Sequence, residues 1–243
     1  MSHRVLLKRG AITLGAIVLL GLLLPVAQVG CTRFVAPSFT PMMAQRWLEA
    51  RLSGKTPTPI RSHWIPITAV PRAFLHNVWA AEDQRFFEHH GIDWEEIDLA
   101  LAESKRSGKP PRGASTITMQ CARSIYLWQG RSWIRKGLET YYTWLMELML
   151  SKRRILELYV NGIEMGDGVY GIHAAAYAHF GEPPDKLSPR QLATLAALLP
   201  NPRGWSVATP PPKLTKRVAK VLRETGRTTF PYTKIGLAPD RKK

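Results

Sequence analysis

The chain has 243 residues, of which 45% are hydrophobic and 21% are charged, so it is long enough to fold around a core of its own. Its 34 lysines and arginines outnumber 18 aspartates and glutamates, and the net charge of +16 favours an anionic partner such as nucleic acid, an anionic membrane or a phosphorylated substrate. The two cysteines, Cys31 and Cys121, form no zinc-binding pattern, which argues against metal–thiolate chemistry, and a disulfide between them has little support because Cys31 would lie at the membrane.

An apolar segment without charged residues, 11–30, lies near the start of the chain. It supplies the roughly 20 apolar residues that a membrane-spanning helix needs. More basic residues precede the segment than follow it closely, which predicts a cytoplasmic N-terminus (residues 1–10) and export of everything after residue 33. A cleaved signal peptide and a lipoprotein cleavage site at Cys31 are the alternatives, and both also export the body of the chain. An exported body makes nucleic acid an unsuitable partner.

The rest of the chain has the apolar periodicity and the capping residues of a mostly α-helical protein. No convincing alternating strand pattern is present. Asp93, Ser115 and Ser132 are the expected N-caps of three helices. We expect a proline-rich linker at 54–67, a loop at 107–114, a basic helix and tail after the prolines at 209–212, and helices at 41–53, 71–90, 93–106, 116–127, 132–150, 151–161, 170–180 and 188–199.

Residues 80–93, "AAEDQRFFEHHGID", combine two adjacent acids with aromatic residues and histidines. On the helix expected over 71–90, Glu82, Phe86 and His89 share one face. Asp83 lies on the neighbouring face. A carboxylate packed among aromatic rings is partly desolvated, which raises its pKa toward that of a useful general base. Exposed helix charges paired with basic residues explain the same acids, so this segment alone leaves both interpretations open.

Residues 112–139 gather hydroxyl, amide and guanidinium groups around the start of one helix. Free N–H groups at a helix N-terminus favour anions, and the nearby cations strengthen that preference, so the segment suits a phosphate or pyrophosphate. The alternative is an ordinary capped helix with surface cations, in which Glu139 forms a plain salt bridge with Arg135. The polar and basic side chains concerned are Ser115, Thr116, Thr118, Gln120, Arg123, Arg131, Arg135 and Lys136.

Five motifs follow one another from residue 80, and a further stretch, "LATLAALLPNP" (192–202), extends the pattern to residue 202. The first consists of Glu82, Asp83, Phe86, His89 and Gly91, and the others are "GASTITMQ" (113–120), "RKGLE" (135–139), "KRRILELYVN" (152–161) and "GVYGIHAAAYAHFG" (168–181). Together they resemble the family 51 peptidoglycan glycosyltransferases, and most of all the monofunctional biosynthetic type. The chain contains no S-x-x-K, so we expect no transpeptidase activity.

The resemblance implies a mostly α fold, in which a lysozyme-like glycosyltransferase lobe and a smaller membrane-facing jaw follow one transmembrane helix. We place the jaw with the linker at 31–70 together with the 105–114 loop, the catalytic domain at 71–210, and a basic C-terminal helix and tail at 211–243. It also implies a single-pass protein of the bacterial inner membrane, with its catalytic domain on the periplasmic side.

The implied reaction polymerises lipid II into β-1,4 glycan strands, with inversion at the reacting carbon and release of undecaprenyl pyrophosphate. Glu82 is the implied general base and Glu139 the second catalytic residue. A divalent metal, Mg²⁺ or Mn²⁺, is expected with the pyrophosphate, and Asp83 is its expected carboxylate ligand. The partners are lipid II, the growing strand, membrane lipids and candidate cell-wall synthesis or division proteins. The implied substrate contacts are Asp83, Phe86, His89, Ser115, Thr116, Thr118, Gln120, Arg123, Arg131, Arg135 and Lys136.

Two residues depart from the family pattern. Met119 replaces a glutamine, and Arg123 stands where lysine or asparagine is more familiar, so donor contacts and efficiency are in question. Two rival functions also fit parts of the pattern: a glycan hydrolase with two carboxylates and a non-catalytic cell-wall scaffold. The cation-rich segment favours the transferase, because hydrolysis of a neutral glycosidic bond needs no pyrophosphate clamp.

Overall fold

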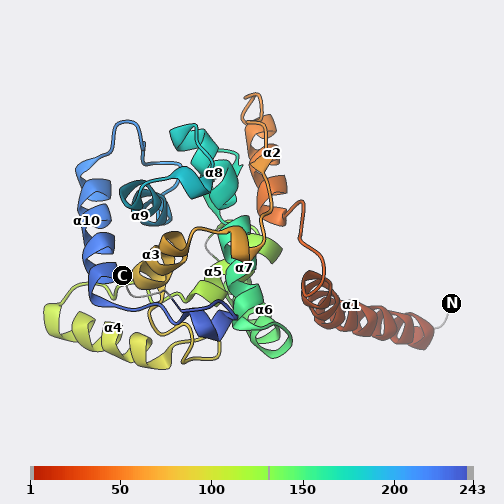
Figure 1. Ribbon diagram of the computed structural model, residues 1–243. Coiled ribbons are helices and arrows are strands. Elements are labelled where there is room, and N and C mark those ends of the chain that lie inside the picture. The colour runs from red at the N-terminus through yellow and green to blue at the C-terminus, as the bar shows by residue number, and fades with distance from the viewer. Residues whose placement is uncertain (1–2, 131, 240–243) are drawn as a thin grey trace.

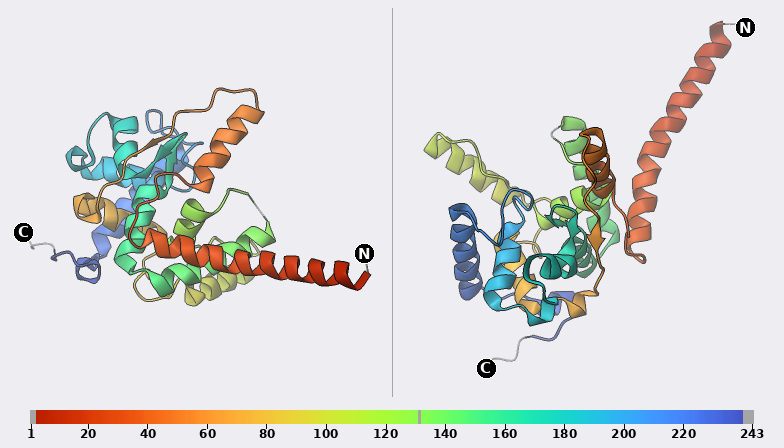
Figure 2. Two further views of the ribbon diagram at one scale, coloured as in Figure 1. Left: turned by 90° about the vertical axis from the view of Figure 1, so that its right-hand side faces the viewer. Right: turned by 90° about the horizontal axis from the view of Figure 1, so that it is seen from above.

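The computed structural model describes residues 3–130 and 132–239, with the backbone alone for residues 3–11 and 17. Helix α1 (His3–Thr32) projects away from a mostly helical body, as the views in Figures 1 and 2 agree. Its stretch Ile12–Thr32 is long and apolar enough to cross a membrane. The predicted fold class, a mostly α protein with one such N-terminal helix, is confirmed.

Loops of different lengths connect the helices of the body, and three short strands of the described chain form a small sheet. The strands are β1 (Arg61–Ser62), β2 (Glu164–Gly166) and β3 (Val169–Tyr170), in the order β1-β3-β2, with β1 parallel and β2 antiparallel to β3. Strands of two or three residues are too short to show an alternating pattern, which is why the sequence did not predict them. The helices are α2 (Pro41–Leu52), α3 (Arg72–Glu82), α4 (Trp94–Ser107), α5 (Ile117–Tyr126), α6 (Trp133–Met149), α7 (Lys152–Gly162), α8 (Gly171–Phe180), α9 (Pro189–Leu198) and α10 (Pro212–Arg227), with 3-10 turns at Ile67–Ala69, Pro184–Lys186 and Tyr232–Ile235.

Local capping chemistry sets most helix starts. Asp93 and Ser132 cap α4 and α6 as predicted, and each side chain accepts a hydrogen bond from the backbone N–H three residues on. At α5 the cap is Thr116 and not the predicted Ser115. The Thr116 hydroxyl accepts a hydrogen bond from the backbone N–H of Met119 at 3.2 Å. Of the hydroxyl groups near the start of α5, that of Thr116 is therefore the helix cap.

The helix predicted at 71–90 ends at Glu82. Asp83 leaves the helical conformation with φ −165° and ψ 81°, and turns follow it. Its carboxylate accepts hydrogen bonds from the backbone N–H of Ile117 at 2.9 Å and from His89 at 3.0 Å, and these bonds hold the chain in a turn. The prediction that Glu82, Phe86 and His89 share one helix face is therefore wrong.

Two groups of helices meet at the core. Helix α5 packs against α6 and α7, while α3 packs against α9 and α10. Phe74 of α3, Ile117 of α5 and Tyr159 of α7 are fully buried, and burial of such apolar surface is the main force that stabilises the fold. This packing brings the end of α3 close to α5, where the candidate site lies.

Aromatic residues fix α1 to the body. Tyr141 of α6 donates a hydrogen bond to the carbonyl oxygen of Leu22 at 2.9 Å, and Tyr142 donates to the side chain of Gln28. The ring of Tyr126 stacks on Tyr142 with centroids 4.7 Å apart. Helix α1 therefore has a defined position against α6.

The two cysteines are free thiols, one exposed (Cys31) and one buried (Cys121). A disulfide between them, which the sequence supported only weakly, does not form. Burial raises the pKa of the Cys121 thiol well above its usual range, so this side chain packs as a small apolar group.

Candidate active site

Glu82 is the last residue of α3, and its side chain is only 11% exposed. One carboxylate oxygen, Oε1, accepts a hydrogen bond from Nη2 of Arg217 at 2.6 Å, and the other, Oε2, accepts one from Nε2 of Gln120 at 2.9 Å. Burial raises the pKa of Glu82 above its ordinary value, although Arg217 and Gln120 both act to lower it. Glu82 is thus a held, partly desolvated carboxylate, which is the property of a general base.

Gln120 cannot turn its amide freely. Its Oε1 accepts a hydrogen bond from the hydroxyl group of Tyr159 at 2.9 Å, so the Nε2 end faces Glu82. The same Nε2 lies 3.4 Å from the carbonyl oxygen of Ser115. A buried chain of polar groups therefore runs from Tyr159 on α7 through α5 to the carboxylate on α3.

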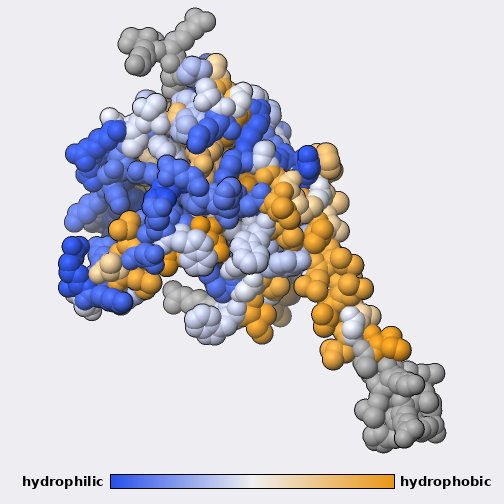
Figure 3. All heavy atoms as spheres, turned by 90° about the horizontal axis from the view of Figure 1, so that it is seen from below, coloured by the Kyte–Doolittle hydropathy of each residue, from blue (hydrophilic) through white to orange (hydrophobic). Residues whose placement is uncertain are grey.

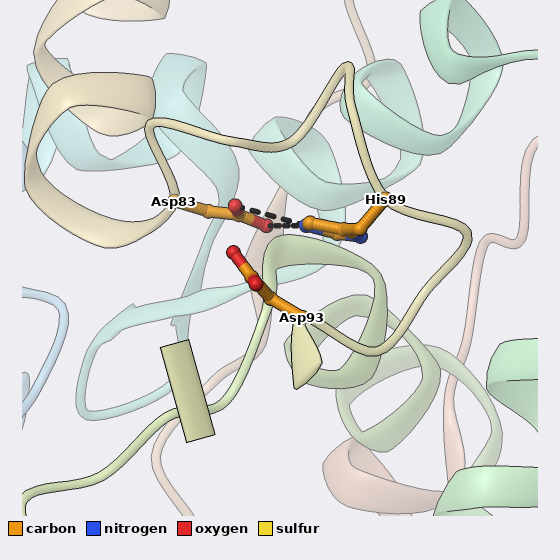
Figure 4. A group of neighbouring side chains, drawn as sticks. All are labelled: Asp83, His89 and Asp93. Atoms are coloured by element: carbon orange, nitrogen blue, oxygen red, sulfur yellow. Dashed lines mark hydrogen bonds and ion pairs between the residues drawn. The ribbon is translucent and has the colours of Figure 1, made fainter. Parts of the chain in front are cut away.

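Asp83 and His89 form a buried pair next to Glu82, and Figure 4 shows the imidazole directed at the carboxylate. His89 Nε2 lies 3.0 Å from both carboxylate oxygens, and its Nδ1 accepts a hydrogen bond from the backbone N–H of Gly91 at 3.1 Å. Because Nδ1 is an acceptor, the ring proton lies on Nε2 and is donated to Asp83. This pair, with the bond from Ile117, fixes the backbone that follows the candidate base.

Asp93 completes a group of three possible metal ligands whose donor atoms lie within 4.8 Å of one another (Figure 4). These atoms already have partners. The protonated Nε2 of His89 cannot coordinate a metal, and Asp93 accepts a hydrogen bond from the N–H of Glu96 at 3.0 Å and lies 3.3 Å from Nε of Arg85. Asp83 is 8% exposed, and both of its oxygens are hydrogen-bonded. This donor set does not fit a divalent cation at Asp83.

Glu139 lies at the centre of a cluster of cations on α5 and α6. Its side chain is fully buried, and it forms ion pairs with Arg135 at 2.5 Å, Lys136 at 2.6 Å and Arg123 at 3.9 Å. Burial alone would raise the pKa of Glu139, but the hydrogen bonds from Lys136 and Arg135 and the charges of Lys136 and Arg123 together lower it. The Arg135–Glu139 salt bridge, which the sequence offered as the alternative explanation of Glu139, is present as one contact of a larger cluster.

Helix α5 connects the two glutamates. Gln120 binds Glu82, and Arg123, three residues further along the helix, faces Glu139. Both residues line one pocket of about 390 Å³, which we call the cleft pocket. Its other walls include Arg46, Gln129, Glu164, Asn201 and Arg203. A substrate in this pocket would contact the helix that links a base with raised pKa to a group of cations.

Several residues that the sequence predicted as substrate contacts are buried inside the protein. Phe86 and Thr118 are fully buried, and the Thr118 hydroxyl donates to Glu147 at 2.5 Å, so neither side chain offers surface to a ligand. Thr116 is 3% exposed and donates to the carbonyl oxygen of Gly91 at 2.5 Å. Arg131 lies outside the described residues.

Arg217 is the residue that sequence reasoning missed. It lies on α10, within the segment expected as a basic C-terminal helix and tail, and it contacts Glu82 across 135 residues of sequence. The place of Arg217 in the apolar pattern of α10 could have indicated that it faces the body of the protein. On α10 the buried residues Leu214, Val218 and Val221 mark the inner face, and Arg217 lies beside them.

Comparison with known proteins agrees with this arrangement. The family model described as Transglycosylase matches residues 50–226. A biosynthetic peptidoglycan transglycosylase of Pseudomonas entomophila (strain L48) is 42% identical over 217 residues, which cover 89% of this chain and 91% of that protein. A protein of the same name from Pseudomonas aeruginosa is 43% identical, over 80% of this chain and 83% of that protein. Another from Xanthomonas campestris pv. campestris (strain B100) is 42% identical, over 82% of this chain and 80% of that protein. The chain belongs to the transglycosylase family and is a glycosyltransferase, as its motifs predicted.

Proposed function

We propose that this protein polymerises lipid II into β-1,4 glycan strands, inverting the reacting carbon and releasing undecaprenyl pyrophosphate. The observation that carries the proposal is the pair of glutamates held on either side of α5: Glu82 is 11% exposed and has one cationic partner, Arg217, whereas Glu139 is fully buried among three cations. One is suited to take up a proton, and the other stays ionised among cations that suit an anionic leaving group.

In the proposed reaction Glu82 accepts the proton of the acceptor 4-hydroxyl group as that oxygen attacks C1 of the donor sugar. The C1–O bond to the pyrophosphate breaks, and its electron pair leaves with the lipid pyrophosphate. Arg217 and Gln120 each engage one oxygen of Glu82, which fixes the direction of the carboxylate. Such positioning converts binding into a productive geometry for attack.

The cations around Glu139 are proposed to bind the departing pyrophosphate. Glu139 holds Arg135 and Lys136 in fixed positions, and Arg123, which is only partly buried, extends the positive charge to the cleft pocket. Preorganised charges stabilise the transition state because they need not reorganise as negative charge develops. Arg131 belongs to the same proposal from its place in the sequence.

A divalent metal remains a prediction. Since both oxygens of Asp83 already accept hydrogen bonds from His89 or Ile117, we propose that phosphate oxygens of the substrate would supply the ligands of any Mg²⁺ or Mn²⁺. Glycan synthesis measured with EDTA, and again after each ion is restored, tests this. Full activity in EDTA contradicts the expected metal requirement.

The surface suits a membrane enzyme. Figure 3 shows hydrophobic residues along α1 and mostly hydrophilic residues over the side of the body away from it. Exposed Trp144 and Leu148 of α6 lie on the helix that contacts α1. We propose that α1 anchors the protein in the bacterial inner membrane with its body in the periplasm, where membrane lipids and cell-wall synthesis or division proteins are its partners. The jaw proposed at 31–70 and 105–114 would face that membrane.

Purified lipid II tests the proposed function. The wild type is expected to form glycan strands without peptide cross-links, and Glu82→Gln is expected to lower the rate about 10²- to 10⁴-fold, because it removes the base. Glu88→Gln is the matched control, since Glu88 is a nearby exposed glutamate whose side chain is 60% exposed. No glycan from the wild type would refute the proposal, and shortening of preformed strands would indicate a hydrolase.

A further inference from the structure

A second pocket of about 390 Å³ lies between α2 and the small sheet, and we call it the α2 pocket. It adjoins the cleft pocket, because Arg46 and Arg203 line both. Each of these arginines is held by a carboxylate on the β2–β3 hairpin. Arg46 binds Glu164 through two hydrogen bonds of 3.0 and 3.2 Å, and Arg203 lies 3.1 Å from Asp167. A polymer that occupies the cleft pocket can therefore continue past this pair of arginines.

The lining of the α2 pocket combines an aromatic ring with polar groups of both charges. Trp47 is 48% exposed, Glu49 and Asp167 supply carboxylates, and Thr58 supplies a hydroxyl group that donates to Asp167 at 2.6 Å. Lys55 adds a cation to the two shared arginines. Mixed charge distinguishes this lining from the cation cluster around Glu139, so the pocket is not a second pyrophosphate site.

A sugar ring fits this combination. Its C–H face packs on an indole ring, and its hydroxyl groups donate to carboxylates and accept from cations, which is how a few polar groups in a pocket fix an oriented ligand. A lipid tail would desolvate the ion pairs of Glu49 with Arg46 and of Asp167 with Arg203, and these carboxylates already neutralise the two arginines that a bare phosphate would need.

An unpaired hydroxyl group in the wall is an independent sign of a ligand. Tyr170 lines the α2 pocket, and its hydroxyl oxygen is buried without a hydrogen-bond partner among the described residues. Buried tyrosine hydroxyls usually have a partner, because an unmade hydrogen bond in a buried place is costly. The hydroxyl oxygen has no accessible surface, so a polar group of a ligand would satisfy it when the pocket wall shifts on binding.

We propose that the α2 pocket is a saccharide subsite that holds a sugar unit of the glycan strand away from the reacting centre. The proposal rests on the proposed function, since it takes the strand as the polymer in the cleft. A strand held at this second place stays bound between successive additions. The subsite therefore affects how long the strands grow, and it leaves the first coupling of two lipid II molecules unaffected.

The first test measures binding without turnover. Full-length protein in detergent is titrated with glycan oligosaccharides stripped of their peptide stems, and binding is followed by tryptophan fluorescence and by calorimetry. Trp47→Ala is expected to weaken binding about fivefold, as the loss of one aromatic contact does, and Trp47→Phe to restore most of it. Trp94→Ala is the matched control, because Trp94 is 66% exposed on α4 and lies outside the pocket lining.

The second test measures strand length from lipid II. Trp47→Ala and Asp167→Asn are expected to shorten the strands while the rate of the first coupling matches that of the wild type. Equal strand lengths in all variants overturn the subsite. Binding of free stem peptide but not of stripped oligosaccharide assigns the pocket to the peptide and also overturns it. Because oligosaccharide binding needs no catalysis, it can succeed where glycan synthesis fails, which separates the subsite from the proposed function.

Discussion

Glu139 offers the sharpest test of how the cation cluster is built. Glu139→Ala removes the ion pair between Glu139 and Arg135. The Arg135 side chain, which is only 9% exposed, then keeps its charge without its carboxylate partner. Lys136 can turn toward water because 40% of its side chain is exposed. Removing one partner of a buried ion pair typically costs about 3–5 kcal/mol, and we assign this cost to Arg135. For a chain of this size that loss lowers the unfolding temperature by roughly 6–20 °C.

The assay is thermal unfolding of the full-length protein in detergent, followed by circular dichroism. Glu139→Gln is expected to lose less, because the amide oxygen still accepts a hydrogen bond. Glu103→Ala is the control for a lost ion pair at the surface, since Glu103 pairs with Arg112 where both side chains are about half exposed, and such pairs are worth about 1 kcal/mol or less. A loss of about 1 kcal/mol lowers the unfolding temperature of a chain of this size by roughly two or three degrees. If the unfolding temperature of Glu139→Ala differs from that of the control by no more than this, the buried ion pair does not stabilise the site as argued.

The contribution of the Glu139 carboxylate to stability should depend on pH in a defined direction. The folded state lowers the pKa of Glu139, so its contribution to stability is present above the ordinary glutamate range and is lost as pH falls through the lowered pKa. Glu139→Gln removes that acid-sensitive contribution. The difference in unfolding temperature between wild type and variant should therefore narrow toward low pH.

Three further predictions concern the base and its supporting turn. Burial raises the pKa of Glu82, so the rate of glycan synthesis should rise with pH along an acidic limb that lies above the ordinary glutamate range; a flat profile there contradicts Glu82 as the base. Arg217→Gln should slow the reaction and move that acidic limb to higher pH, because the guanidinium group favours the charged form of Glu82. Arg217→Lys should move the limb less, since it keeps a positive charge. A limb that does not move in Arg217→Gln shows that the contact does not tune the pKa of the base. Gly91→Ala should cost about 2–4 kcal/mol of unfolding free energy, since Gly91 has φ +91° and an added Cβ would lie 2.6 Å from a methyl group of Thr143, and thermal unfolding measures it.

Local chemistry made much of the helical framework predictable from sequence. A cap such as Asp93 or Ser132 acts on a backbone N–H only three residues away, so the residues that decide a helix start lie within one short stretch of sequence. The same holds for the apolar stretch Ile12–Thr32, whose length and composition suffice to identify it.

The site depended on contacts that no short stretch contains. Helix α3 ends at Glu82 because Asp83 binds a backbone N–H at Ile117, 34 residues later, and helical periodicity alone favoured continuation. Arg217 reaches Glu82 from 135 residues away, and nothing near Arg217 in the sequence indicates that contact. The family motifs supplied Glu82 and Glu139 and the salt bridge between Glu139 and Arg135, whereas the contact of Arg217 with Glu82 came only from the folded chain.

The contact between Tyr141 and Leu22 sets a geometric limit on how the enzyme meets its substrate. Leu22 lies ten residues before the end of α1, which at 1.5 Å per residue is about 15 Å along the helix axis. Helix α6 therefore reaches the middle of the segment that can span a membrane, Ile12–Thr32, and it carries Glu139 on the same helix. A bilayer that holds α1 at its own depth also holds the reacting groups at a fixed height. A lipid-linked sugar, the proposed substrate, then meets the site by a search in two dimensions at that height, and a flexible tether in place of these hydrogen bonds would leave the height undefined.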